Sequence, residues 1–575
     1  MIKDRFNAKK LLYCGLFLWL VINLIQAFFT EIHEDEAYYA LFGEHLAWGY
    51  YDHPPMVALM TFLSSQLFSG ILGVRFFTVV ASCLTLLIVW KIASTDDVVG
   101  GSCIDCFVVP PRNDAKRQTD SPRPSLRGGS AKRAILYFTL ACSVVIFNLY
   151  GFVTTPDAGL LLFSALFLFF YQRYCSNPSW KNALLMGLLM ALMVYSKYHA
   201  FLLLGLIVLS NLKLLKDGKF WAACLVALAL LMPHIVWQIQ ADFPSLRYHL
   251  SGRSEPFRWS YFLEYLPNQL LMFNPFVFGS LAYVLVKHKA RDRIERGLWF
   301  VLIGFFAFFW LMSFRGHVEP HWTAVGAISA VVLLYRYAWI DSKLMKYVKF
   351  TIAPSLILIA ALRIVLLTPT AAIFGFCKDK PHYEAIASEA NNHPVVFQGS
   401  FQQPALYHYF TGNESSTLCC YYDRKTQYDL WQFDTAWIGK PVYVYGHYFT
   451  ENFQTANRLM MDFQITNDSN QHPLVISTND IIQMDFTIYN PSSQIVEFQP
   501  EMIPRLLLLD DNTTRYCKFA PIPLLLPKAT YKGHLTTQLG PDTRTGKNHL
   551  LLCIGDRIAF FGERNKAVEV MVTEP

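Results

Sequence analysis

Apolar runs of roughly 16 to 22 residues, separated by short polar breaks, recur along the chain up to about residue 370 and stop there. A run near 20 residues is what an α-helix needs to cross the hydrocarbon core of a bilayer. Charged residues make up 16% of the chain, against about 25% in soluble domains. The pattern predicts a polytopic α-helical membrane protein with a soluble C-terminal region.

The apolar pattern predicts about eleven membrane-spanning helices. The flank of the first run lacks a small-residue cleavage site, so we expect an uncleaved helix rather than a signal peptide. We predict the spans at residues 11–29, 71–92, 134–152, 157–173, 182–196, 198–215, 219–239, 263–287, 297–314, 323–340 and 350–369.

Lysine and arginine set the predicted orientation. They gather before the first span and after the second, sixth, eighth and tenth, which are all loops on one side of the membrane. The positive-inside rule makes that side cytoplasmic. The N-terminus is then cytoplasmic and the C-terminal region external, and the net charge of +7 does not indicate a nucleic-acid partner because it is spread over these loops.

Composition divides the chain further. Residues 1–370 form the predicted transmembrane domain, and residues 94–133 within it are rich in Gly, Pro, Ser and Arg, which predicts a disordered cytoplasmic loop. Residues 371–470 mix helix-like and strand-like stretches, which predicts an external α/β region. Residues 471–575 show short alternating runs with turn residues between them, which predicts a β-sandwich-like domain.

The loop between the first two spans is unusual for a membrane surface. Anionic headgroups attract Lys and Arg, yet this loop is acidic, rich in aromatic residues and ends in Pro-Pro. It therefore indicates a site rather than an anchor. Its six carboxylates are Glu31, Glu34, Asp35, Glu36, Glu44 and Asp52.

Under the predicted topology, further polar residues collect on the same external face. Ionisable groups near a membrane core cost about 2.5–3.5 kcal/mol each, so they imply partners or a wet cavity. A carboxylate can take a proton from an attacking hydroxyl, cations can stabilise a departing phosphate, and Asp and His suit a divalent metal. Besides the acidic loop with His53, the residues are Thr154–Asp157, Lys197, His249, Arg253 and the segment His317–His321.

Each candidate also has an ordinary structural interpretation. Asp35 could cap a short helix, Asp157 could favour a helix dipole, and Asp52 could be a turn residue before Pro-Pro. Lys197 could reach the interface by snorkelling, and His249 could be a surface histidine. The segment His317–His321 contains Pro320, which breaks the helix that a zincin motif needs, so cavity lining or a polar loop is expected there.

Several motifs in order resemble one family. Asp35-Glu36 early in the first external loop, the segment Gly49–Pro55 (GYYDHPP), Arg75 in the next helix, and Thr155-Pro-Asp157 resemble the bacterial aminoarabinose-transferase and protein O-mannosyltransferase group of C-type membrane glycosyltransferases. The resemblance covers roughly residues 10–370. It implies that fold, a location in the inner membrane, and transfer of a hexosyl or pentosyl group from a polyprenyl-phosphate carrier to an acceptor on the outer side.

The resemblance also implies roles for individual residues. Asp35 would be the catalytic base and Asp157 the second essential acid. Asp52 and His249 would be ligands of a divalent metal such as Mg, Mn or Zn. The phosphate-binding residues would be Lys197, Arg253 and His53, the last standing where the family usually has Lys.

The sequence leaves the acceptor open among lipid A of lipopolysaccharide, another glycolipid, a glycan and a protein. Two other functions compete with a glycosyltransferase. A polyprenyl-linked sugar transporter or flippase usually shows repeated halves, and we find no internal repeat. An envelope scaffold whose external domain binds glycan would place no chemistry in the membrane part.

Overall fold

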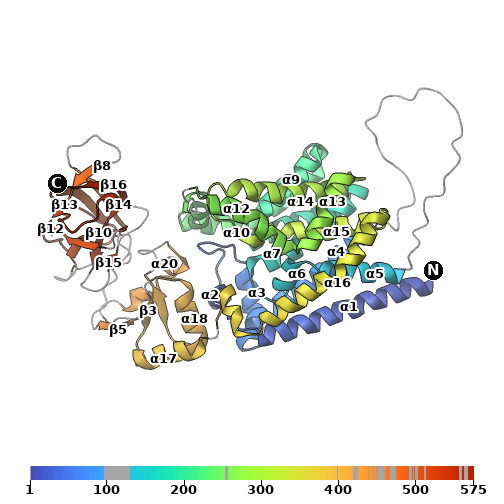
Figure 1. The fold of residues 1–575 in the computed structure, drawn as a ribbon, viewed down its shortest axis with the longest axis horizontal. Helices are drawn as coiled ribbons and strands as arrows, with labels where there is room; N and C mark the ends of the chain where they lie inside the picture. The colour runs from blue at the N-terminus through green and yellow to red at the C-terminus, as the bar shows by residue number, and fades with distance from the viewer. Residues whose placement is uncertain are drawn as a thin grey trace, which may run out of the picture. The chain divides into compact units, whose positions relative to one another are not determined.

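The computed structural model of this chain separates into two units, residues 1–378 and 379–575 (Figure 1). Each unit has its own hydrophobic core and is described by itself. The residues that the structure describes are 2–95, 130–252, 257–377, 379–397, 399–418, 425–437, 440–445, 448–450, 460–466, 474–490, 495, 498, 503–510, 513–555, 560–561 and 567–574.

The first unit is helical, and it makes the chain a multi-pass membrane protein. Six helices of the described residues are long and apolar enough to cross a bilayer, and each coincides with a predicted span. A bent helix pair would make seven, so the total of eleven stays a prediction. The six are α1 (Ile2–Phe29), α4 (Gly70–Ser94), α7 (Pro156–Ser176), α10 (Gly218–Gln240), α14 (Arg293–Met312) and α16 (Ser342–Val365).

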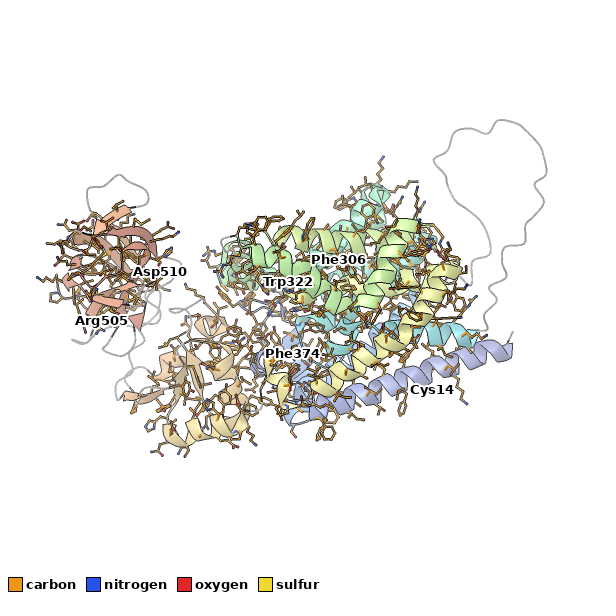
Figure 2. All side chains as sticks on the ribbon, viewed as in Figure 1. Cys14, Phe306, Trp322, Phe374, Arg505 and Asp510 are labelled. Carbon is orange, nitrogen blue, oxygen red and sulfur yellow. The ribbon has the colours of Figure 1, made fainter. Side chains whose placement is uncertain are left out.

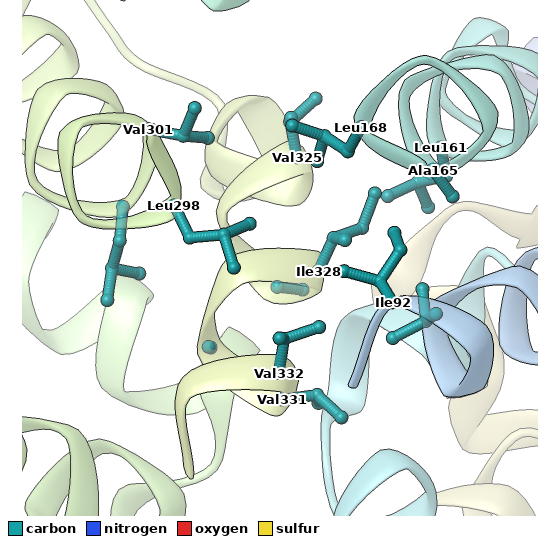
Figure 3. Close-up of a cluster of buried hydrophobic side chains, with 14 of the residues drawn as sticks. Ile92, Leu161, Ala165, Leu168, Leu298, Val301, Val325, Ile328, Val331 and Val332 are labelled. Atoms are coloured by element: carbon teal, nitrogen blue, oxygen red, sulfur yellow. The ribbon is translucent and has the colours of Figure 1, made fainter. Parts of the chain in front are cut away.

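Shorter helices fill the space between the long ones. α15 is the innermost, because all fifteen of its residues are buried, as expected for a helix that is apolar on every side. Its residues Ile328 and Val332 meet Ile92 of α4, Leu161 of α7 and Leu298 of α14 (Figure 3). The shorter helices are α5 (Ser130–Cys142), α6 (Val145–Leu149), α8 (Trp180–Ser196), α9 (Ala200–Ser210) and α15 (Ala324–Ala338).

The outer helices carry apolar side chains on an exposed face. Only 22% of the apolar window of α16 and 28% of that of α10 is buried, against 61% for α7. Cys14 lies on the exposed side of α1 (Figure 2), near Phe17, which is 67% exposed. These faces are suited to contact with lipid tails, whereas α7 lies inside the bundle.

Two predicted spans are interrupted. The predicted span 263–287 is α12 (Trp259–Phe273) followed by α13 (Pro275–Lys287), and the two helices meet at 102°. Pro275 disfavours the helical conformation at the residue before it, and Asn274 adopts a φ of +69°. Prediction as one continuous helix was therefore wrong.

The second interruption lies in the predicted span 134–152, which divides into α5 and α6 at Ser143. The Nδ2 of Asn274 donates a 3.0 Å hydrogen bond to the carbonyl of Ser143, so the two breaks meet. The predicted disordered loop 94–133 also ends too late, because residues 130–133 form the first turn of α5. Residues 96–129 of that loop lie outside the described residues.

The acidic loop contains two helices, α2 (Glu34–Glu44) and α3 (Met56–Ser65). α2 begins at a capping box in which the His33 ring accepts from the N–H of Asp35 at 3.1 Å, and Glu36 accepts from the N–H of His33 at 3.0 Å. Ahead of it, β1 (Ile32–His33) pairs antiparallel with β2 (Phe376–Cys377). The first unit thus extends past the predicted boundary at residue 370.

Single turns connect the longer elements of the first unit. They matter here because three of them, α11, η3 and η4, contribute side chains to the polar region described below. They are η2 (Leu212–Lys216), α11 (Pro244–Arg247), η3 (Tyr248–Gly252, a π-helical turn), η4 (Pro320–Thr323) and η5 (Pro369–Phe374).

The second unit begins with an α/β region. Its sheet has the order β4-β3-β5-β6, with β3 parallel to β4 and β5. Among the described residues of this region, three helices and a 3-10 turn accompany the sheet. The elements are α17 (Lys380–Ala390), β3 (Val395–Phe397), α18 (Gln402–Thr411), β4 (Ser415–Thr417), α20 (Gln427–Trp431), η6 (Phe433–Trp437), β5 (Val442–Val444) and β6 (Tyr448–Thr450).

The rest of the second unit has two sheets, of order β11-β10-β14-β16-β8 with β15 beside β14, and β12-β13-β9-β7. Burial alternates along β9, as in a strand with one face on a core. β7 pairs with β9, so the predicted boundary at residues 470/471 lies too late. The strands are β7 (Met460–Ile465), β8 (Leu474–Ser477), β9 (Ile481–Tyr489), β10 (Ile503–Leu508), β11 (Thr513–Tyr516), β12 (Lys518–Phe519), β13 (Thr530–Gln538), β14 (Gly546–Gly555), β15 (Phe560–Phe561) and β16 (Val568–Thr573).

Candidate active site

Three predicted acids from distant parts of the first unit act electrostatically on one phenol, that of Tyr39 on α2. Burial raises the pKa of Tyr39 well above its ordinary value, and the negative charges of Asp35, Asp52 and Asp157 raise it further. Contacts agree for two of these regions, because Asp35 lies in the first turn of the same helix and the ring of His53, next to Asp52, lies 3.1 Å from the Tyr39 hydroxyl. The fold therefore brings the start of α2, the turn before α3 and the start of α7 to one place.

Asp157 forms an ion pair with Lys197. Asp157 is the second residue of α7 and is 1% exposed, and Lys197 follows the last residue of α8 in extended backbone. The Nζ of Lys197 donates to Oδ2 of Asp157 at 2.7 Å. Among the described residues, Oδ1 of Asp157 has no hydrogen-bond partner. This carboxylate is thus only half satisfied, which is costly in a buried position unless a ligand completes it.

His321 also approaches the carboxylate of this ion pair. It lies on η4, and its Nε2 is 3.5 Å from the same Oδ2 of Asp157. Its ring also lies against Tyr150, with the centroids 5.4 Å apart. Within the same segment, His317 is instead 3.8 Å from Glu319. Of these two histidines, His321 is therefore the one that lies beside Asp157.

Asp35 is the most accessible of the three acids. Its side chain is 38% exposed, and its Oδ2 lies 3.9 Å from Nδ1 of His33. Asp52 is 5% exposed and Asp157 1%. A carboxylate that takes a proton from an incoming hydroxyl must be reachable, and Asp35 meets that requirement.

The neighbouring Glu36 is fully buried and saturated. It accepts from Nε of Arg75 at 2.8 Å, from the N–H of Thr154 at 2.7 Å and from the N–H of His33 at 3.0 Å. Arg75 also donates to the main-chain carbonyl of Thr30 at 2.7 Å. The Glu36–Arg75 pair therefore fastens α2 to α4 beside the turn that carries Asp157, and its role is structural.

Two of the three predicted phosphate-binding residues lie beside the acids, and the third is not described. Lys197 is engaged by Asp157, as above. The Nε2 of His53 lies 3.1 Å from the hydroxyl of Tyr39, which places this histidine beside the acids. Arg253 lies outside the described residues.

The two residues predicted as metal ligands, Asp52 and His249, lie next to each other. The Nε2 of His249 lies 3.1 Å from the main-chain carbonyl of Asp52. A carbonyl only accepts, so Nε2 carries the proton in this contact. No group of three or more His, Cys, Asp or Glu in the described part of the chain could hold a metal ion.

The comparisons with known proteins agree with this architecture. ArnT from Cupriavidus metallidurans, described as bound to undecaprenyl phosphate, matches 79% of this chain and 93% of its own with a TM-score of 0.50 and 14% identity. The chain has an ArnT-like fold. An identity of 14% shows the fold but not the activity. The match therefore confirms the fold that the motif resemblance implied.

Other matches are more limited. The family model described as dolichyl-phosphate-mannose-protein mannosyltransferase matches residues 129–237, which include Asp157 and Lys197 of the ArnT-like unit. The S. cerevisiae Pmt1-Pmt2 complex bound to the sugar donor covers 46% of this chain and 36% of its own at 15% identity, with a TM-score of 0.28, too low to support an argument. No curated protein matches the sequence.

The ArnT-like unit also contains polar residues that sequence reasoning passed over. His234 and Gln238 lie one turn apart on α10 and are 5% and 8% exposed, and Tyr198 stands next to Lys197 between α8 and α9. The signal was present, because His and Gln at this spacing beside Pro233 are unusual in an apolar run. The sequence pattern did not predict that His234 would bond the main-chain carbonyl of Trp48.

Proposed function

We propose that this protein is a glycosyltransferase that moves a sugar from a polyprenyl-phosphate carrier to an acceptor at the external face of the inner membrane. One observation carries the proposal: buried Asp157 is paired with Lys197 and approached by His321, and its charge acts with those of Asp35 and Asp52 at Tyr39. The ArnT-like fold adds support, because the ArnT structure is described as bound to undecaprenyl phosphate.

In the proposed reaction, Asp35 takes the proton of the acceptor hydroxyl as its oxygen attacks the anomeric carbon of the sugar. The bond between that carbon and the phosphate oxygen breaks, and its electron pair leaves with the polyprenyl phosphate. A single displacement of this kind inverts the anomeric centre. The 38% exposure of the Asp35 side chain gives an acceptor access to it.

Lys197 and Asp157 serve the leaving group and the sugar. The ammonium of Lys197 uses one donor on Asp157 and keeps two for the departing phosphate oxygens, whose growing charge it stabilises. Asp157 fixes the direction of Lys197 through Oδ2, and its Oδ1 is suited to accept from a sugar hydroxyl. His53 and Arg253 are proposed as further phosphate contacts, and a divalent metal stays a separate prediction in which no step is placed.

The transferred group is proposed to be a hexose or pentose, and the acceptor to be lipid A, another glycolipid, a glycan or a protein. The proposed orientation, with a cytoplasmic N-terminus and residues 379–575 outside, follows from the basic loops. Mass spectrometry of envelope glycolipids and glycoproteins, with and without the protein, identifies the product.

The decisive variant is Asp35→Asn, which keeps the shape and removes the base. We expect sugar transfer to be lost, while membrane insertion and the thermal unfolding profile match the wild type. Glu34→Gln is the matched control, because it neutralises the adjacent carboxylate of the same helix turn and should retain transfer. Full transfer by Asp35→Asn would exclude the proposed base.

A polyprenyl-linked sugar flippase is the second candidate, favoured by the break between α12 and α13. Transporters often use discontinuous helices near the middle of the membrane. Here the Asn274 side chain hydrogen-bonds main-chain groups at the break. It accepts from the N–H of Phe276 at 3.1 Å and donates to the carbonyl of Ser143. Substrate counterflow in vesicles without any glycosylated product would favour the flippase.

A further inference from the structure

Three alternate carbonyls of the acidic loop accept hydrogen bonds from one continuous stretch of chain. His234 of α10 bonds the carbonyl of Trp48 at 2.6 Å, and Ser245 of α11 bonds that of Tyr50 at 2.7 Å. His249 of η3 bonds the carbonyl of Asp52 at 3.1 Å. These three bonds, made at every second residue, hold segment 48–52 along this stretch in one register.

The same contact requires glycine at position 49. A Cβ on Gly49 would lie 2.3 and 2.5 Å from ring atoms of Trp237 and 2.9 Å from Cε1 of His234. Contacts this short with rigid rings do not occur, so any other residue would push the loop away from α10. The rings of His234 and Trp237 stack, with centroids 5.9 Å apart, and leave little room to move.

A chain of hydrogen bonds continues from His234 toward Lys197. The carbonyl of Trp48 only accepts, so Nδ1 of His234 donates and, in the neutral ring, Nε2 accepts. The hydroxyl of Tyr198 lies 3.0 Å from Nε2 and can donate to it. The Tyr198 oxygen in turn accepts from Nε2 of Gln238 at 2.9 Å. Tyr198 directly follows Lys197, so α10 holds both the loop and the lysine turn.

We propose that Gly49, Tyr198, His234 and Ser245 form a clamp that positions Asp52 and Lys197 for sugar transfer. The inference rests on the proposed function, and the four are positioning residues that do not touch the reacting atoms. Asp52 is two residues beyond the bonded carbonyl of Tyr50, and Lys197 is one residue before Tyr198. A displacement of about 1 Å in such a site can cost on the order of a hundredfold in rate, so small losses of register have large effects.

Paired variants of His234 test the hydrogen bond to Trp48. His234→Leu removes the donor, and we expect kcat to fall about 10- to 100-fold with a change of less than about threefold in KM for the donor lipid. His234→Asn keeps an N–H near the position of Nδ1 and should restore kcat to within about threefold of wild type. Equal, wild-type rates for both variants would overturn the clamp, as would an equal loss in two variants that remain folded.

A suppressor pair tests the steric contact. Gly49→Ala should lower kcat as His234→Leu does, because the new methyl group meets the Trp237 ring. Trp237→Leu removes the ring atoms that it meets, so the double variant Gly49→Ala with Trp237→Leu should recover at least half of the activity of Trp237→Leu alone. A double variant no better than Gly49→Ala would contradict the proposed contact.

A structural measurement separates failure of the clamp from failure of the proposed function. Hydrogen exchange of residues 46–53 is measured by mass spectrometry on the purified full chain in lipid nanodiscs. Ser245→Ala should raise exchange there, whereas Ser280→Ala, which removes a buried hydroxyl bonded within α13, should not. If Ser245→Ala raises exchange but the wild-type protein transfers no sugar, the clamp is kept and the proposed function is rejected. If the wild-type protein is active and Ser245→Ala changes neither exchange nor kcat, the clamp is rejected.

Discussion

In the described part of the helical unit, clusters of buried charge lie at the two ends of α7, and these clusters differ in how completely their carboxylates are bonded. Glu295 accepts from the main-chain N–H of Arg291 at 2.9 Å, from Arg336 at 3.3 Å and from the hydroxyl of Tyr337 at 3.0 Å. It is 0% exposed. Every direction of this carboxylate faces a donor, so the cluster can be explained by stability alone.

The cluster at the start of α7 is organised differently. Asp157 uses one oxygen for Lys197 and His321 and leaves the other without a partner among the described residues. Asp35 keeps more than a third of its side chain exposed. The buried carboxylate is thus saturated at one end of α7 and open at the other, and the open cluster is the one that can take a substrate.

The distance between the clusters follows from α7 itself. Arg336 donates to the carbonyl of Ile92 at 2.9 Å, and Gln172 of α7 reaches the same carbonyl at 3.5 Å. Gln172 is fifteen residues beyond Asp157, or about 22 Å along a helix. Changes in one cluster should therefore leave the other intact, which makes the comparison open to experiment.

The largest expected effect belongs to the saturated cluster. Arg336→Leu leaves Glu295 with fewer buried partners and should lower the free energy of unfolding by about 3–5 kcal/mol, measured by unfolding in detergent micelles. Sugar transfer per folded molecule should equal that of the wild type. A loss of transfer in the folded fraction would show that this cluster is not purely structural.

Lys197→Met should act on transfer instead. Loss of a cation that stabilises a departing phosphate costs about 2.7–4 kcal/mol, or about 100- to 1000-fold in kcat, measured with a polyprenyl-phosphate sugar in isolated membranes. Lys219→Met is the control, since Nζ of Lys219 bonds only an exposed carbonyl, that of Pro178. Undiminished transfer by Lys197→Met would show that the cluster at the start of α7, like the Glu295 cluster, does not act in transfer.

His321→Gln should have the smallest effect. At 3.5 Å from Asp157 and with a side chain 25% exposed, His321 is expected to contribute about 0.5–1.5 kcal/mol, or about two- to tenfold in kcat/KM. His317→Gln, whose histidine lies beside Glu319 and not beside Asp157, is its control. Equal effects of the two substitutions would assign them to the loop as a whole and remove His321 from the open cluster.

The sequence predicted more of the open cluster than of its support. The parity of the basic loops and the motif resemblance predicted Asp35, Asp157 and Lys197 on one face, and the structure pairs Lys197 with Asp157. The resemblance assigned the base to Asp35, but residue type alone does not separate Asp35 from Glu36, because both are carboxylates one residue apart and packing decides which of them meets Arg75. His321 was named only as part of the segment His317–His321, whose role stayed open.

Main-chain contacts and helix breaks were harder to predict. Main-chain carbonyls are the same at every residue, so the sequence could not show that those of Trp48, Tyr50 and Asp52 accept hydrogen bonds from α10, α11 and η3. The break at Asn274 did leave a signal in Asn-Pro, but the apolar run continues through it and hydropathy alone joined the two helices. β7 was placed in the wrong region because a strand's partner, here β9, is not evident from its own residues.

The short pairing of β1 with β2 bears on how the two units can be separated. The N–H of Glu34 donates to the carbonyl of Gly375 at 3.0 Å, and a Cβ on Gly375 would lie 2.8 Å from Nε2 of His33, the residue that caps the helix bearing Asp35. Residues 375–377 thus brace that cap, although they come after the last membrane helix. An engineered truncation or chimera joined at residue 366 would strip this brace away, whereas a junction after residue 378 would spare it and let the remainder be exchanged as a cassette.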